Sequence, residues 1–168
     1  SKKKYYVETL EYLKQKGKDG SFMAQNVFDT CTDKEVAHLQ FVPFSKPPLF
    51  FSQPKLGSEG PICLLDWQLP TIKVEINAQN EQKLKRLQRL MDRLEANLNI
   101  TVTPYFRKKI DGYECFFIIK KSKEALDEDV KGGRITQEDV DCRPAWYESM
   151  GFFIAEGRQS NHFEKDKK

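Results

Sequence analysis

Apolar residues recur with a helical period at two places in the chain. Residues 4–16 put Tyr6, Leu10 and Leu13 on one face, as an amphipathic helix does. A longer helical pattern covers residues 81–97, with lysines and arginines on its polar side. Its apolar stripe consists of Leu84, Leu87, Met91, Leu94 and Leu98. This stripe is too short for a coiled coil by itself, so we expect the helix to pack on a sheet.

Strand patterns lie on both sides of the longer helix. Residues 72–76 alternate apolar and charged positions, as a half-buried strand does. Residues 99–110 and 113–121 are rich in aromatic and β-branched side chains, and they flank the pair Asp111-Gly112. An Asp-Gly pair favours a two-residue type I′ turn, because both turn residues need a positive φ. The sequence therefore predicts a β-hairpin around this pair.

The segments before residue 70 are shorter. Residues 21–32 predict a loop or a short helix, residues 55–61 predict a loop, and residues 62–67 predict a short apolar strand. Prolines interrupt an aromatic stretch at residues 41–54, which favours edge strands or loops there.

After the hairpin, the pattern returns to helices. Residues 123–129 predict a short helix, and Thr136 with Asp139 resembles a capping box at the start of another. Residues 152–155 predict a last short strand, because they are apolar and follow the helix breaker Gly151.

These elements predict a single α+β domain over residues 1–160, with an antiparallel or mixed sheet backed by one long amphipathic helix. Residues 1–60 supply an N-terminal helical element and a Phe/Pro-rich region, and residues 62–157 supply the core. Residues 161–168 form a charged tail that we expect to be disordered. Over residues 71–155 the order is β-α-β-β-α-β, which resembles the ferredoxin-like arrangement used by RNA recognition motifs.

This resemblance concerns the order of elements more than the motifs. Residues 111–118 stand where the ribonucleoprotein-1 octamer of that family lies, and Gly112 and Tyr113 match its second and third positions. Glu114 and Cys115 differ from the small residue and the aromatic residue that follow in the family. The first strand also lacks the aromatic of the second motif. The base-stacking face of the family is therefore not matched.

Positive charge is concentrated in residues 73–123, which carry 12 Lys/Arg and 6 Asp/Glu in a chain of net charge +3. Cations on a helix and on a hairpin suit contact with phosphates, although a solvated lysine-rich surface is the plainer alternative. We expect the cations near the hairpin turn to be exposed and to contribute little to stability. The leading interpretation is a non-enzymatic module, within a larger protein or assembly, that contacts nucleic-acid phosphates. Its candidate residues are Lys83, Arg86, Arg89, Arg93, Arg107, Lys108, Lys109, Lys120 and Lys121.

A protein-interaction domain is the second interpretation. The aromatic stretch at residues 41–54 would then dock a partner through Phe44, Phe50 and Phe51. The plainer interpretation of these aromatics is that they fill the core or cover a sheet edge.

A degenerate N-acetyltransferase-like domain is the third interpretation. Residues 145–152 resemble the Tyr-Glu-x-x-Gly-Phe end of GCN5-related N-acetyltransferases. The resemblance implies that Tyr147 stands near the thioester and the leaving thiolate. The pyrophosphate-binding loop of that family has no counterpart in the sequence, so an enzyme is not the leading expectation.

Cysteine and histidine usage indicates an intracellular protein without a metal site. The cysteines at positions 31, 63, 115 and 142 are scattered, and Cys63 and Cys115 lie in apolar runs where free thiols behave as core residues. There is no CxxC pair, and the chain contains 2 His, so zinc is not expected. The pattern indicates no cofactor. No apolar run approaches the roughly 20 residues that span a bilayer, so no membrane association is expected.

Overall fold

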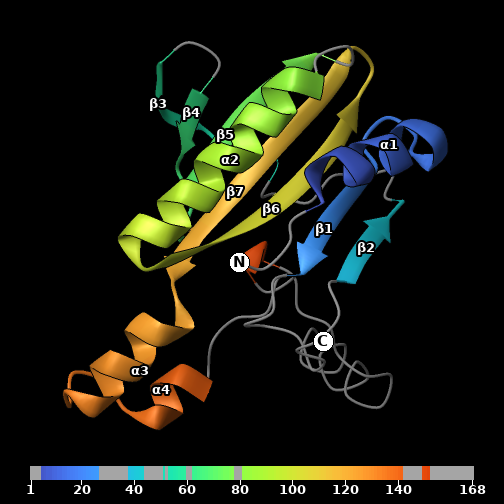
Figure 1. Ribbon diagram of the computed structural model, residues 1–168. Coiled ribbons are helices and arrows are strands. Elements are labelled where there is room, and N and C mark those ends of the chain that lie inside the picture. The colour runs from blue at the N-terminus through green and yellow to red at the C-terminus, as the bar shows by residue number, and fades with distance from the viewer. Residues whose placement is uncertain are drawn as a thin grey trace, which may run out of the picture.

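The computed structural model (Figure 1) describes residues 5–26, 38–43, 51, 53–59, 62–77, 81–141 and 149–151. Its elements confirm the α+β class. In chain order they are α1 (Tyr6–Lys16), β1 (Phe22–Asn26), β2 (His38–Val42), β3 (Lys55–Glu59), β4 (Ile62–Leu65), β5 (Thr71–Asn77), α2 (Glu81–Leu98), β6 (Ile100–Lys109), β7 (Gly112–Lys121), α3 (Lys123–Lys131) and α4 (Gln137–Asp141).

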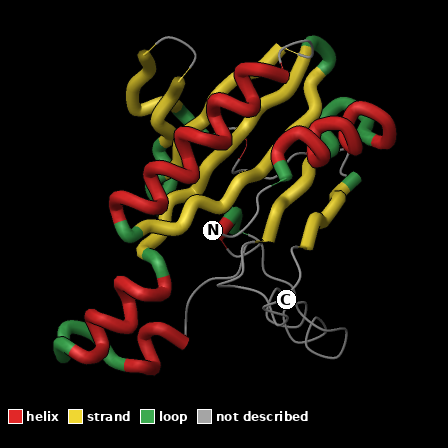
Figure 2. The backbone as a smooth tube through the Cα atoms, viewed as in Figure 1, coloured by secondary structure: helices red, strands yellow, loops and turns green. Residues whose placement is uncertain are grey.

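The strands form one seven-stranded sheet in the order β2-β1-β6-β7-β5-β4-β3. Each described pair of neighbours is antiparallel. The long β6–β7 hairpin lies at the centre, and α1 and α2 lie side by side over one face (Figures 1 and 2). The expected long helix on an antiparallel sheet is therefore confirmed, together with the N-terminal helix.

The central part of the sheet has the split β-α-β arrangement that the element order predicts. β5 and β6 are joined by α2, and β7 lies between them antiparallel to both. In a ferredoxin-like domain the fourth strand lies on the far side of the first. That place beside β5 is occupied here by β4, which precedes β5 in the chain. The strand expected at residues 152–155 lies outside the described residues.

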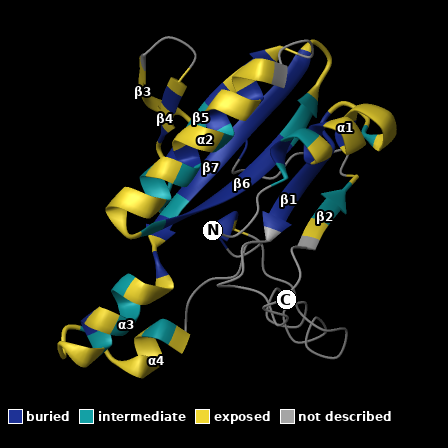
Figure 3. Cartoon of the chain, viewed as in Figure 1, coloured by how far each residue is buried: buried dark blue, intermediate teal, exposed yellow. Residues whose placement is uncertain are grey.

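Apolar residues fill both faces of the sheet. Beneath α1 and α2, the cluster includes Tyr6, Leu13, Met91, Phe106 and Phe117. On the other face, a second cluster consists of Phe22, Ala24, Phe51, Leu65, Tyr105, Phe116, Ile118 and Met150. β6 and β7 are consequently buried along most of their length, whereas the outer side of α2 is exposed (Figure 3).

Two sequence-based predictions are wrong because pairing within the sheet decides the structure. Residues 22–26, expected in a loop or helix, form β1 between β2 and β6. Residues 55–59, expected in a loop, form β3 on the edge beside β4. Both segments are only five residues long, so their local sequence preference is weak. Backbone hydrogen bonds to a neighbouring strand therefore decide their structure.

The hairpin forms as predicted, but its turn is not type I′. Lys109 pairs with Gly112, so the two loop residues are Ile110 and Asp111. Among the described non-glycine residues, Asn99 alone has a positive φ, so Asp111 does not meet the type I′ requirement. Gly112 is required for a different reason. A Cβ there would lie 2.5 Å from the carbonyl oxygen of Ile76 on β5.

Two other local predictions are confirmed. Thr136 and Asp139 form a reciprocal capping box: the Asp139 amide donates to Thr136 Oγ1 at 3.2 Å, and the Thr136 amide donates to Asp139 Oδ2 at 2.8 Å. Cys63 and Cys115 are buried free thiols, and burial raises the pKa of Cys115. Within the part of the chain that is described, no helix is both long and apolar enough to cross a bilayer.

Candidate nucleic-acid interface

The outer face of α2 carries an arginine stripe, formed by Arg86, Arg89 and Arg93. Their spacing of three and four residues puts the guanidinium groups on one side of the helix. All three are exposed, because the opposite side of α2 buries Leu87 and Met91 against the sheet. The stripe spans about 10 Å at a rise of about 1.5 Å per residue. That length covers about three successive phosphates of one strand, which follow one another at roughly 3.4 Å along the axis of a duplex.

Two carboxylates of α2, Asp92 and Glu95, lie on another side of the helix. Glu95 Oε1 accepts a hydrogen bond from the Val102 amide of β6 at 2.6 Å. Burial raises the pKa of the Tyr6 phenol on α1, and the nearby charges of Glu95 and then Asp92 raise it further. This flank therefore faces β6 and α1. Lys83 and Arg86 lie on the opposite flank, whereas Arg89 is three residues from Asp92 and so borders the acidic side.

The expectation of exposed charges near the hairpin turn is wrong for Arg107 and Lys108. The Arg107 side chain is 12% exposed, forms an ion pair with Glu114 at 3.3 Å, and lies 5.1 Å from the centre of the Phe51 ring. Lys108 Nζ donates to two backbone carbonyls at the end of α1, those of Lys14 at 3.2 Å and Gly17 at 2.8 Å. Both cations serve the fold, since Arg107 pairs with the poorly exposed Glu114 and Lys108 satisfies carbonyls at the end of α1.

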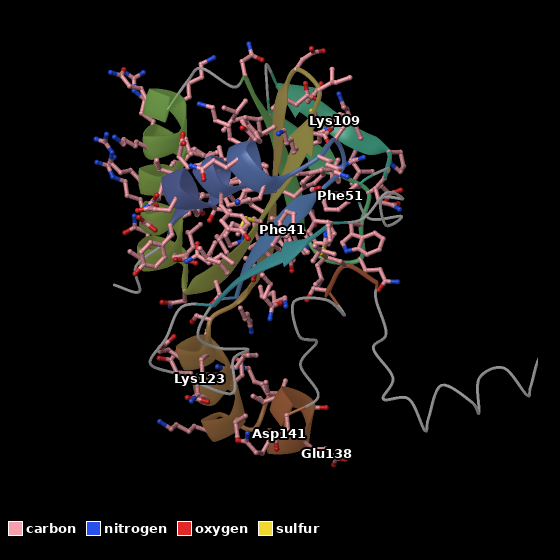
Figure 4. All side chains as sticks on the ribbon, turned by 90° about the vertical axis from the view of Figure 1, so that its right-hand side faces the viewer. Phe41, Phe51, Lys109, Lys123, Glu138 and Asp141 are labelled. Carbon is pink, nitrogen blue, oxygen red and sulfur yellow. The ribbon has the colours of Figure 1, made fainter. Side chains whose placement is uncertain are left out.

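Lys109 is exposed but lies on the other side of the sheet from α2 (Figure 4). It lines a hollow of about 470 Å³ together with Asp19, Glu75, Asp111 and Glu114. These carboxylates would repel a phosphate, so this hollow does not extend the arginine stripe.

The lysines at the base of the hairpin are also engaged. Lys120 is 9% exposed, and its Nζ donates to Ser149 Oγ at 2.5 Å. Lys121 forms an ion pair with Asp129 of α3, and Arg134 contacts the same carboxylate at 2.6 Å. The hydrogen bonds from Lys121 and then Arg134 hold the pKa of Asp129 below its usual value. The helix and hairpin cations therefore do not form one continuous surface.

An ion-pair chain on the sheet, formed by Lys73, Glu114 and Arg107, was missed by the sequence analysis. Glu114 on β7 contacts Lys73 on β5 at 2.6 Å and Arg107 on β6 at 3.3 Å. Burial alone would lower the pKa of Lys73, but the hydrogen bond and charge of Glu114 and then of Glu75 raise it overall. Strand alternation offered a signal, because these positions share the face opposite the helices.

The residues of the other two interpretations are only partly described. Phe51 is 6% exposed and packs between Phe22 and Phe116, with ring centres 5.1 and 4.9 Å away. It fills the core, as the plainer interpretation held. Phe44, Phe50 and Tyr147 lie outside the described residues. The N-acetyltransferase interpretation also predicts that a pair of central strands is splayed apart. The ladders joining β7 to β5 and to β6 run without a break, so no splay is seen in this part of the sheet.

No family model matches the chain, and neither the curated proteins nor the solved structures contain a significant match. Among the described residues, no group of three or more His, Cys, Asp or Glu side chains is arranged to hold a metal ion. The physical features of the chain are therefore the basis for any functional assignment.

Proposed function

We propose that this domain is a non-enzymatic module that binds nucleic acid through the arginine stripe of α2. The observation that carries the proposal is that three exposed guanidinium groups share one side of a rigid helix. Each guanidinium can donate two parallel hydrogen bonds to a phosphate, which favours arginine at such sites. The interface is narrower than the sequence indicated, because Arg107, Lys108 and Lys120 are held by the fold and Lys121 pairs with Asp129.

The proposed contact is with the backbone and not with the bases. A single helix face with three cations neutralises about three phosphates, which gives weak, sequence-independent binding. The aromatics of the central strands are buried, with Tyr105, Phe116 and Phe117 each 0% exposed. Their rings are therefore not available for base stacking.

The test is a titration of fluorescently labelled single-stranded and duplex oligonucleotides at several salt concentrations. Neutralising about three phosphates predicts that affinity falls roughly 20- to 40-fold between about 50 and 200 mM salt. Changing Arg86, Arg89 and Arg93 together to Glu should abolish binding. These residues are exposed, so circular dichroism and thermal melting should show an intact fold.

The matched control carries the same change in net charge on other elements. Lys16, Lys123 and Lys131 are exposed on α1 and α3, and their replacement by Glu should weaken binding far less than the arginine triple variant. Equal losses in both variants would mean that only the overall charge matters, and the proposed site would be wrong. Absence of binding by the unmodified chain at about 50 mM salt would also refute the proposal.

A further inference from the structure

An apolar patch on β4, formed by Ile62 and Leu64, is left uncovered beside α2. Ile62 is 43% exposed and Leu64 is 45% exposed. They pair with Val74 and Ile72 of β5, so they lie on the face that α1 and α2 cover elsewhere. The helix layer thus ends over β5, and the neighbouring apolar positions of β4 remain open to solvent.

The β4 patch forms the wall of a hollow. Ile62 and Leu64 line a space of about 720 Å³ with Gly57 and Ser58 of β3. A Cβ built on Gly57 would meet no atom within 4 Å, so the floor of the hollow has room for another side chain. The residues that line the hollow all belong to β3 and β4, and α2 has an exposed apolar side chain of its own, Leu90, which is 45% exposed.

Charge on the flank of α2 that carries Leu90 indicates the kind of partner. Lys83, Arg86 and Leu90 are three and four residues apart, so two cations and one apolar side chain share a row along α2. Glu95 bonds to β6 on the opposite flank, so this row faces the side of the sheet where β4 lies (Figure 1). A partner lying there would meet apolar surface below and positive charge beside it.

We propose that the β4 patch and this flank of α2 dock an amphipathic helix of another protein, with apolar residues on one face and Asp or Glu along its edge. A helix beside α2, at the usual interaxial distance of roughly 8–10 Å, would continue the layer that α1 and α2 begin. Its carboxylates would approach Lys83 and Arg86. A β-strand partner suits the site less well, because the edge strand β3 carries a register shift between Lys55 and Gly57.

Arg86 belongs to both surfaces, but the inference can be tested apart from nucleic-acid binding, because it depends on Ile62 and Leu64, which lie outside the arginine stripe. The probe is a library of displayed helical peptides of about 18 residues, selected on the unmodified chain and counter-selected on Ile62→Asp/Leu64→Asp. The recovered sequences should share an apolar face and an acidic edge. Synthetic copies should bind in fluorescence anisotropy and lose about tenfold or more with that double variant. Thermal melting checks its fold, and Ile62→Thr/Leu64→Thr gives a milder second variant.

Two comparisons separate this site from the arginine stripe. Lys83→Glu should weaken binding of the acidic peptide about tenfold. It should not weaken binding of a peptide that carries Gln in place of each Glu. Arg89→Glu should reduce oligonucleotide binding and leave peptide binding unchanged, whereas the Ile62/Leu64 variants should do the reverse. The proposal is overturned if no selected peptide depends on Ile62 and Leu64. It is also overturned if sedimentation shows that these residues join two copies of this chain, or if oligonucleotides occupy the patch instead.

Discussion

The two faces of the sheet are built differently, although the same strands supply both. Toward α1 and α2, β6 and β7 present Phe106, Tyr113, Cys115 and Phe117, which form a wholly apolar cluster. Away from the helices, the same strands combine aromatic rings with the ion-pair chain that Glu114 centres. The centre of one face is therefore apolar, with polar contacts such as those of Lys108 at its edges, whereas the other face combines packing with a buried ion-pair chain.

This difference shows why charge in the sequence does not report charge at the surface. A cation on a central strand is surrounded by neighbouring strands, so it is retained only with a carboxylate or carbonyl partner, as for Arg107 and Lys108. A cation on the outer side of a covering helix stays exposed to solvent, as for Arg89, whose Nε contacts only the Lys85 carbonyl of its own helix at 3.4 Å among the described hydrogen bonds. The distinction is one of place in the fold, because all three residues belong to the same basic segment.

The largest effects should come from cavities on either face. Phe106→Ala on the helix-covered face and Phe116→Ala on the other should each lower the free energy of unfolding by about 3–5 kcal/mol, because both rings are 0% exposed. Urea denaturation measures both losses. Leu98, which is 58% exposed, is the control, and its change to Ala should cost less than about 1 kcal/mol. A small loss for Phe116→Ala alone would mean that the second face is not a true core.

The charged part of the second face should come next. Glu114→Gln removes the shared partner of Lys73 and Arg107, whose side chains are 13% and 12% exposed. Leaving two poorly solvated cations together should cost about 2–4 kcal/mol. Glu75 also contacts Lys73 but its side chain is 60% exposed, so Glu75→Gln should cost below about 1 kcal/mol. Equal urea midpoints for the two variants would contradict the difference between buried and exposed partners.

The close approach of Gly112 on β7 to the backbone of β5 allows a test that involves no charge. Gly112→Val would force a Cβ to within 2.5 Å of the Ile76 carbonyl oxygen, so we expect a loss of more than about 1 kcal/mol. Gly57 on β3 is the matched control, because a Cβ there meets nothing within 4 Å, and Gly57→Val should change the melting temperature little. A similar shift in both variants would mean that backbone entropy, and not the close approach, decides the cost.

The sequence predicts elements with strong periods and misses those that depend on neighbours. α2 and the β6–β7 hairpin are long and have a regular apolar pattern, so their bounds could be predicted within a residue or two. β1, between β2 and β6, and β3, at the edge of the sheet, are five-residue strands that form through pairing with other strands. In the candidate site, Arg86, Arg89 and Arg93 could be found from helical spacing. The engagement of Arg107 and Lys108 could not, because their partners lie on β7 and at the end of α1.

The smallest expected effect is a pH dependence confined to the second face. The pKa of Lys73 is raised in the folded protein, since Glu114 and Glu75 outweigh burial. Its stabilisation should therefore be complete below the ordinary lysine pKa of about 10.4 and decline as pH rises through the folded value. Burial also raises the pKa of Tyr6, which lowers stability at high pH in any variant that keeps it.

Comparison of the unmodified chain with Lys73→Met cancels such shared effects. The difference in unfolding free energy between the two should be constant from about pH 7 to 9 and then narrow above about pH 10. Urea denaturation at each pH gives that difference. Lys108→Met serves as the control on the helix-covered side, because Lys108 bonds to neutral carbonyls and not to a carboxylate. A difference for Lys73→Met that stays constant to about pH 11 would mean that its alkyl chain, and not its charge, stabilises the second face.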